Sequence, residues 1–206
     1  MSNIRLFLEL FPSKNIRSVT ESNKESFLDL IKSKNPSSSI IEEPDGTYTV
    51  EGSLDISDMD LSGIPVKFKE ITGSLDCSYN RLTSLDNSPI DVGQTFICSH
   101  NMLKSLTGAP VSVGNSFDCS HNQLTNLVGT PKSLGGGLYC SHNMLTSLKG
   151  VPSIVAGTFD CSNNYLTSLV GAPKRVENRF ICKNNRKKFT REEVYSLCDV
   201  YGDVIV

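Results

Sequence analysis

The sequence has no tryptophan, and it has no apolar run close to the roughly 20 residues that a membrane-spanning helix needs. We therefore expect no transmembrane segment. Arg5 and Glu9 interrupt the N-terminal apolar stretch around Leu6–Phe11, and no small-residue cleavage site follows it, so we expect no secretion signal either. The formal charge is only −2, which disfavours a general affinity for nucleic acid.

Motifs typical of common enzymes and cofactor sites are also missing. The sequence contains no P-loop, no GxGxxG after a strand and no HExxH. The glycines at 135–137 belong to the spacer of one repeat, and they predict a tight turn and not a phosphate cradle. No CxxC pair is present, which disfavours a zinc site built from cysteines. We therefore expect a protein that is not an enzyme and that holds neither a cofactor nor a metal.

The sequence does contain an internal repeat with a constant period of 21 residues. The stretch FICSHNML, which begins at Phe96, recurs downstream as FDCSHNQL, LYCSHNML and FDCSNNYL, and upstream as LDCSYNRL. The blocks begin at positions 75, 96, 117, 138 and 159, without slippage. Such a fixed period indicates a solenoid of stacked coils, in which each unit buries its apolar face against its neighbours.

Each unit begins with an apolar or aromatic residue (Φ) in the pattern Φ-x-Cys-Ser-x-Asn-x-Leu. Φ and Cys are two residues apart, so they point to the same side of a short strand, where we expect them to form the core. The equal spacing of the cysteines favours packing over a disulfide framework, and unpaired thiols suit the reducing cytoplasm. Six of the seven cysteines occupy this position: Cys77, Cys98, Cys119, Cys140, Cys161 and Cys182.

The recurring asparagine marks the point where the chain leaves the strand. A buried amide there can satisfy backbone groups that would otherwise lack partners. Glycine and proline follow further along each unit and exclude a regular helix, so we expect turns and extended or 3₁₀ segments on the convex side. The asparagines of this column are Asn80, Asn101, Asn122, Asn143, Asn164 and Asn185.

The core Φ-x-Cys-x-x-Asn-x-Leu resembles the leucine-rich-repeat consensus L-x-L-x-x-N-x-L, with cysteine in the second apolar position. The tandem CS-x-N-x-LTSL-x-GAP units are similar to the short repeats of bacterial secreted effectors. They are even more similar to leucine-rich proteins encoded by large tailed bacteriophages. The resemblance implies a mostly β, α/β-type fold: a curved, right-handed parallel-strand solenoid with an irregular convex side. It also implies a protein that binds a bacterial host protein in the host cytoplasm, for host takeover or against a host defence.

Residues 1–44 lie outside the repeat and predict a helical N-terminal cap. Apolar residues recur at helical spacing over 4–11, and a second helix is predicted from about 20 to 34. We expect these helices to cover the open edge of the first repeat. A separate pair of partner-binding helices is the alternative.

The solenoid itself is expected over residues 45–189, as about six and a half repeats counted from Leu54. Residues 190–206 predict a C-terminal capping helix and tail. A capping box of Thr190 and Glu193 marks the start of that helix.

Three solvent-facing columns are expected on the concave face: the residue between Φ and Cys, the residue after Cys, and the next one. Neighbours in a column should lie ~5 Å apart. Every middle repeat offers the same Ser-His pair, so no single catalytic site stands out. Tyr139 and Ile97 are the expected energetic anchors. The predicted partner-binding residues are Ile97, His100, Asp118, His121, Tyr139, His142 and Asp160.

All three histidines of the chain fall in one of these columns. A straight ladder with ~5 Å spacing does not converge on a tetrahedral zinc site, so duplication of the repeat is the simpler explanation. Stacked imidazoles repel one another when protonated. We therefore expect binding at this face to weaken or change below about pH 6.5.

A basic cluster near the C-terminal end is the alternative site. It could bind nucleic acid or an acidic partner, although it lacks an aromatic stacking series and a solvated cap surface would also explain it. A structural role in a virion or assembly is a third alternative. The sequence does not specify an oligomeric state. The residues of the basic cluster are Lys183, Arg186, Lys187 and Lys188.

Overall fold

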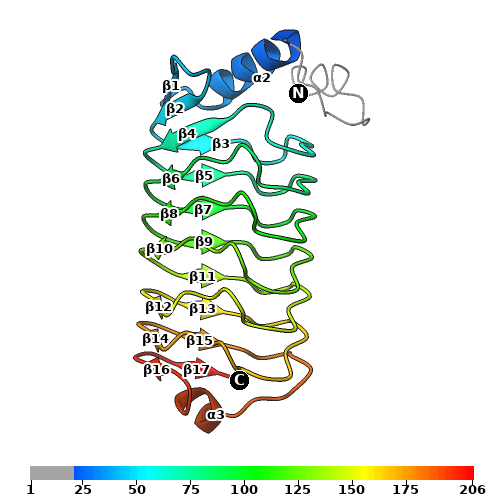
Figure 1. Ribbon diagram of the computed structural model, residues 1–206, viewed down its shortest axis with the longest axis vertical. Coiled ribbons are helices and arrows are strands. Elements are labelled where there is room, and N and C mark those ends of the chain that lie inside the picture. Colours follow the sequence, from blue (N-terminus) through cyan, green and yellow to red (C-terminus); the bar gives the residue numbers. More distant parts are fainter. Residues whose placement is uncertain (1–20) are drawn as a thin grey trace.

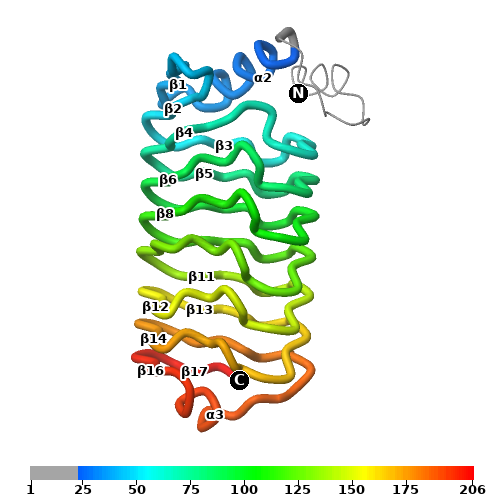
Figure 2. The backbone as a smooth tube through the Cα atoms, viewed as in Figure 1, coloured from blue at the N-terminus to red at the C-terminus, as the bar shows by residue number. Residues whose placement is uncertain are grey.

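The computed structural model describes residues 21–206, which form a single stack of short coils with one helix at each end (Figure 1). The chain climbs one coil at a time along the long axis, as the backbone trace in Figure 2 shows. The apolar residues predicted to form a helix over 4–11 lie outside the described residues. Within residues 21–206, no helix is long and apolar enough to cross a membrane.

One parallel sheet of eight short strands runs the length of the stack. Each strand contributes a buried Φ residue, and the six strands from β5 to β15 are each followed by a buried cysteine, so this sheet forms one wall of the core. The rings of Phe96 and Phe117 stack with centroids 5.4 Å apart, which links successive coils inside that wall. In chain order, the strands are β3 (Leu54–Asp55), β5 (Leu75–Asp76), β7 (Phe96–Ile97), β9 (Phe117–Asp118), β11 (Leu138–Tyr139), β13 (Phe159–Asp160), β15 (Phe180–Ile181) and β17 (Val204–Ile205).

A second wall arises where the sequence predicts turns and extended segments. The extended segments pair across coils as two further sheets, of six and three strands, and bury a column of aliphatic residues such as Val92 and Val113. No pairing joins β10 to β12, and the glycines at 135–137 follow β10 at this break. The strands are β1 (Ser39–Glu42), β2 (Tyr48–Glu51), β4 (Phe68–Ile71), β6 (Asp91–Val92), β8 (Ser112–Val113), β10 (Ser133–Leu134), β12 (Ile154–Val155), β14 (Arg175–Val176) and β16 (Asp199–Val200).

The asparagine column ties neighbouring coils together at the corner that follows each main-sheet strand. The Asn122 side-chain oxygen accepts a hydrogen bond from the Leu103 N–H at 2.9 Å. Its Nδ2 donates to the carbonyl of Cys98 in the preceding coil and to the carbonyls of Cys119 and Ser120 in its own coil. One buried amide thus satisfies backbone groups of two coils, as the sequence predicts.

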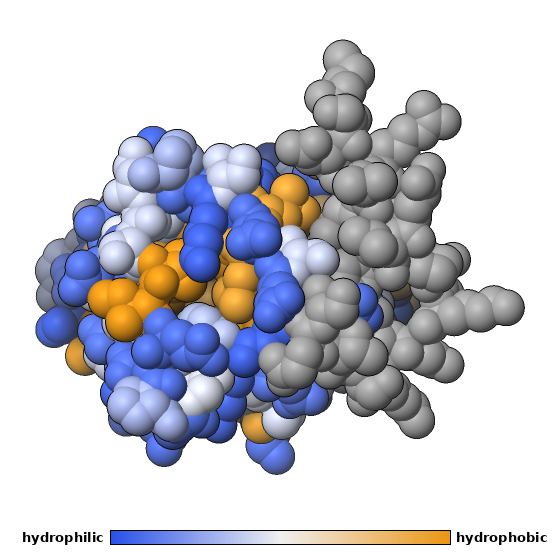
Figure 3. All heavy atoms as spheres, turned by 90° about the horizontal axis from the view of Figure 1, so that it is seen from above, coloured by the Kyte–Doolittle hydropathy of each residue, from blue (hydrophilic) through white to orange (hydrophobic). Residues whose placement is uncertain are grey.

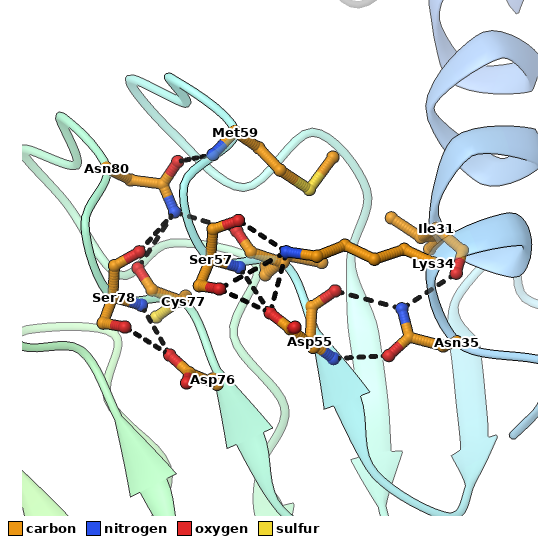
Figure 4. Close-up of polar contacts among 11 residues, drawn as sticks. Ile31, Lys34, Asn35, Asp55, Ser57, Met59, Asp76, Cys77, Ser78 and Asn80 are labelled. Carbon is orange, nitrogen blue, oxygen red and sulfur yellow. Dashed lines mark hydrogen bonds and ion pairs between the residues drawn. The ribbon is translucent and has the colours of Figure 1, made fainter. Parts of the chain in front are cut away.

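The N-terminal helix α2 (Glu21–Lys34) covers the edge of the first coil (Figure 4). Asn35 follows the helix, and its side chain takes the place of a neighbouring strand at the edge of β3. Its amide oxygen accepts a hydrogen bond from the Asp55 N–H at 2.7 Å, and its Nδ2 donates to the Asp55 carbonyl at 3.0 Å. Lys34 adds a 2.9 Å ion pair with the Asp55 carboxylate. The edge of β3 is therefore already paired. Seen from above, this end of the molecule shows apolar surface among polar side chains (Figure 3).

The C-terminal end contains one more coil than the sequence indicates. The short helix α3 (Arg191–Tyr195) begins with the predicted capping box, in which Thr190 and Glu193 bond reciprocally. The chain does not end as a tail after this helix. It returns as β16, which pairs with β14, and then as β17, which pairs with β15. The solenoid therefore continues past residue 189, and α3 is part of its last coil.

Candidate functional site

The side of the eight-stranded sheet that faces solvent, together with the corner that follows each strand, is called the strand face below. Four of the predicted binding residues lie on its strands in neighbouring register. Ile97 pairs with Asp118, Asp118 with Tyr139, and Tyr139 with Asp160 along adjacent strands. All four side chains are partly exposed. The Tyr139 ring lies against Gly137, where an added Cβ would come within 2.9 Å of a ring carbon.

Most of the serine column is buried, which corrects the expectation from the sequence. Where an aspartate lies two residues earlier, the serine turns toward it: the Ser78 hydroxyl donates to the Asp76 carboxylate at 2.6 Å, and its N–H donates at 2.9 Å. The Ser120 N–H donates to Asp118 in the same way. The strand face therefore presents aspartates whose carboxylates are held by a turn, and not a ladder of hydroxyls. The buried members of the column are Ser78, Ser99, Ser120 and Ser162.

The third column forms a continuous stack of rings. Tyr79 stacks on His100 with centroids 4.2 Å apart, and His100 stacks on His121 at 4.0 Å. His121 stacks in turn on His142 at 4.2 Å, with the planes 10° from parallel. These rings are closer than the usual strand spacing of ~4.8 Å. The stack is partly exposed throughout, and Tyr79 at its end is 60% exposed.

Backbone conformation explains which residue types occupy this column. Every member has a positive φ between 52° and 56°. Only glycine, asparagine, aspartate and histidine adopt this left-handed region at modest cost. The column contains histidine, asparagine and aspartate in agreement with that preference, and one tyrosine that departs from it. Its members are Asp58, Tyr79, His100, His121, His142, Asn163 and Asn184.

His121 has a perturbed titration because it lies in the middle of the stack. Partial burial lowers its pKa from the usual value of 6.5, and the neighbouring imidazoles of His100 and His142 lower it further. The Asp118 carboxylate acts in the opposite direction. In residues 21–206, no group of three or more histidine, cysteine or acidic side chains is placed to hold a metal ion.

A neighbouring column that the sequence reading missed adds apolar surface to the strand face. It is the residue between the asparagine and the following leucine, where Met102 is 46% exposed, Met144 44% and Tyr165 43%. Exposed methionine and tyrosine are enriched where proteins bind one another. The signal is present in the sequence, because this slot varies among Arg81, Met102, Gln123, Met144 and Tyr165 while its neighbours hold constant types.

The cysteines are packing groups and not reactive sites. All seven are buried and none forms a disulfide. Burial raises the pKa of the Cys98 and Cys140 thiols well above 9.0, because the charged thiolate would be desolvated. The Cys140 thiol donates to the Asp160 carbonyl of the next coil at 3.1 Å. The column therefore links coils in the core.

Much of the basic cluster is engaged in contacts with nearby side chains. Lys187 forms an ion pair with Glu193, and the Arg186 guanidinium lies 4.9 Å from the Tyr165 ring centroid. Lys183 and Lys188 are exposed and make no ion pair within residues 21–206. They border a pocket of about 270 Å³ beside Phe189. The cluster is thus a local site at one end of the stack and not a long basic stripe.

Comparison with protein-family models, with curated proteins and with solved structures gives no match for this chain. The structure itself defines the class: the chain is a repeat protein, a mostly β solenoid of about eight parallel-strand coils with few helices. Its repeated surface columns and its end pocket are the candidate sites.

Proposed function

We propose that this protein is a non-enzymatic binding module of the leucine-rich-repeat type, and that its strand face binds a protein partner. The observation that carries the proposal is the exposed ring stack of Tyr79, His100, His121 and His142. It runs beside the partly exposed Ile97 and Tyr139 and the exposed Met102. Aromatic and methionine side chains that are exposed on a rigid support are the groups that usually dominate protein interfaces.

The rigidity of the scaffold supports this proposal. The backbone of the face is held by main-sheet pairing, by the asparagine column and by the Asp–Ser turns, so little conformational entropy remains to be lost on binding. The resemblance to repeats encoded by large tailed bacteriophages supports a bacterial host protein as the partner, in host takeover or against a host defence. The seven unpaired thiols fit a cytoplasmic site of action.

The repeat itself supplies variants that should leave the fold intact. Each substitution introduces the residue that another coil has at the same position: Ile97→Asp and Tyr139→Asp imitate Asp118, while His121→Asn and His142→Asn imitate Asn163. The control variant combines Val128→Lys and Val170→Lys, which imitate Lys149 in an exposed column away from the strand face.

The tagged protein and both variants would be used to capture partners from bacterial lysate, after circular dichroism has confirmed folding. The proposal predicts a bacterial protein that the native and control chains retain and that the strand-face variant loses. Equal retention by all three chains, or loss only from the control variant, would place the binding surface elsewhere on the molecule.

Binding of nucleic acid or an acidic partner through Lys183, Arg186, Lys187 and Lys188 remains the second candidate function. The exposed Lys183 and Lys188 favour it. Retention on heparin that falls steeply with salt, and that is lost in a chain carrying Lys183→Glu and Lys188→Glu, would support this alternative. A structural role in a virion predicts instead that the protein sediments with particles.

A further inference from the structure

The second wall contains a column of glycines that ends in the middle of the stack. At Gly114, an added Cβ would come within 2.0 Å of the Gly93 carbonyl oxygen, and at Gly135 it would come within 2.1 Å of the Gly114 oxygen. These coils therefore approach one another more closely than a residue with a Cβ allows. The next member of the column is Ala156, which has one. The same close approach cannot continue past Gly135.

The hydrogen bonds that run along this column are interrupted at the same place. The Gly135 N–H donates to a carbonyl of the preceding coil at 3.1 Å, and the Glu177 N–H does so again at 3.0 Å. By this pattern the Ala156 N–H would donate to the Leu134 carbonyl, but it has no acceptor within residues 21–206. The strands β10 and β12 are correspondingly unpaired with each other. This break in the second wall, between β10 and β12, is called the seam below.

Side chains at the seam are more exposed than their counterparts in adjacent coils. Val113 and Val155 are fully buried, whereas Leu134, which holds the same position in the coil between them, is only partly buried. Ile154, on the other side of the seam, is 48% exposed. Incomplete burial and unpaired main-chain groups are the features of a segment that opens at a low cost in free energy.

The main sheet, in contrast, continues past the seam without interruption. In that sheet β11 pairs with β9 on one side and with β13 on the other (Figure 1). The Asn143 side chain also joins the two coils that flank the seam, through the Cys119 carbonyl and the Leu124 N–H, both at 3.0 Å. One wall is thus held and the adjoining wall is open, so these two coils can pivot about the main sheet. Tyr139 of the strand face lies on β11, at the pivot.

We propose that the seam is a hinge, kept open by Ala156, at which the parts of the solenoid before and after it tilt relative to each other. The tilt changes the shape of the strand face around Tyr139 and adjusts it to the surface that it binds. The hinge itself stands on the glycine column and the unpaired strands. Its effect on binding rests on the proposed function of the strand face.

The width of a distance distribution between two spin labels, measured by pulsed electron paramagnetic resonance on the full chain, tests the hinge. One pair of labels spans the seam, at Val111→Cys and Lys174→Cys. The matched pair, at Lys69→Cys and Lys132→Cys, is also three coils apart but lies wholly before the seam. All four positions are exposed, whereas the native thiols are buried and should not be labelled. We expect a distribution about twofold broader across the seam, because a hinge adds a tilt to the label motion.

A glycine at the interrupted position should close the seam. Ala156→Gly removes the Cβ that keeps the two coils apart, so it should narrow the distribution across the seam, while Ala109→Gly in another coil should leave it unchanged. Equal widths for the two label pairs, or no narrowing in Ala156→Gly, would overturn the hinge. These results need no partner, so a failed partner capture would not affect them. With a captured partner, binding should narrow the distribution across the seam, and an unchanged width would overturn the adjustment of the strand face.

Discussion

The imidazole ring of His121 lies 4.0 Å from that of His100, with the two planes 11° from parallel. Because His142 stacks on the opposite side, any positive charge on His121 is enclosed between two other titratable rings. The same face therefore provides ring surface for binding and a group whose charge depends on pH.

We predict that this stack makes the protein less stable in mild acid. The folded state lowers the pKa of His121 below 6.5, so the unfolded state binds that proton more strongly. Stability is unaffected above 6.5, falls as the pH drops from 6.5 through the folded pKa, and is fully reduced below it. Tm measured against pH should decline less steeply in His121→Asn than in the native chain. Identical slopes, or an NMR titration of His121 at or above 6.5, would contradict this.

The asparagine column should be far more sensitive to substitution than asparagines elsewhere. Asn122→Ala leaves the buried Leu103 N–H without its acceptor and removes one of the two amide donors to the Cys98 carbonyl. We expect a loss of about 2–4 kcal/mol in the free energy of unfolding, measured by urea denaturation. Asn126→Ser is the control, because serine occupies that slot in other coils and the position lies outside the core. Its effect should stay within about 0.5 kcal/mol, and equal effects of the two substitutions would refute a special role for the column.

The cysteines should be inert until the protein unfolds. All seven thiols are buried, and desolvation keeps those of the core column protonated. A thiol-specific chromogenic reagent should therefore react very slowly with the native chain and with seven equivalents in denaturant. Fast native labelling of a core-column cysteine, identified by mass spectrometry, would show that the coils open locally.

The N-terminal cap should protect the first strand from pairing with other chains. Asn35→Ala removes both side-chain hydrogen bonds to the Asp55 backbone and exposes the edge of β3. We expect a loss of about 1–3 kcal/mol in stability and more association at high concentration, seen by light scattering. Lys34→Gln should cost at most about 1 kcal/mol, because its ion pair is largely solvent-exposed. A larger effect at Lys34 than at Asn35 would mean that charge, and not strand pairing, holds the cap.

The regular part of the fold could be predicted from the sequence because each position has the same role in every coil. The constant spacing of Cys98 and Asn101 in the repeat implies parallel strands, a thiol core and an asparagine corner, and the structure has all three. The direction of Ser78 could not be predicted. Strand alternation alone does not reveal that the chain already turns there, toward Asp76.

The irregular parts of the fold could not be predicted from the sequence, because the repeat pattern does not extend to them. The strand at Val204 does not follow Phe180 at the 21-residue spacing, because α3 is inserted in its coil, and it has no cysteine to mark it. The close stacking of His100 on His121 depends on the left-handed backbone of both residues, which periodicity does not encode. The end pocket likewise lies where Lys187 replaces the leucine of the preceding coils.

The claim that the strand face is the binding surface can be tested by placing a photo-reactive amino acid at position 139 in one chain and at position 128 in another. Tyr139 lies on the strand face, and Val128 is 49% exposed in a different column. Irradiation in the bacterial cytoplasm should cross-link one bacterial protein from position 139 and none from position 128. Cross-links from position 128 alone, or the same products from both positions, would contradict the account.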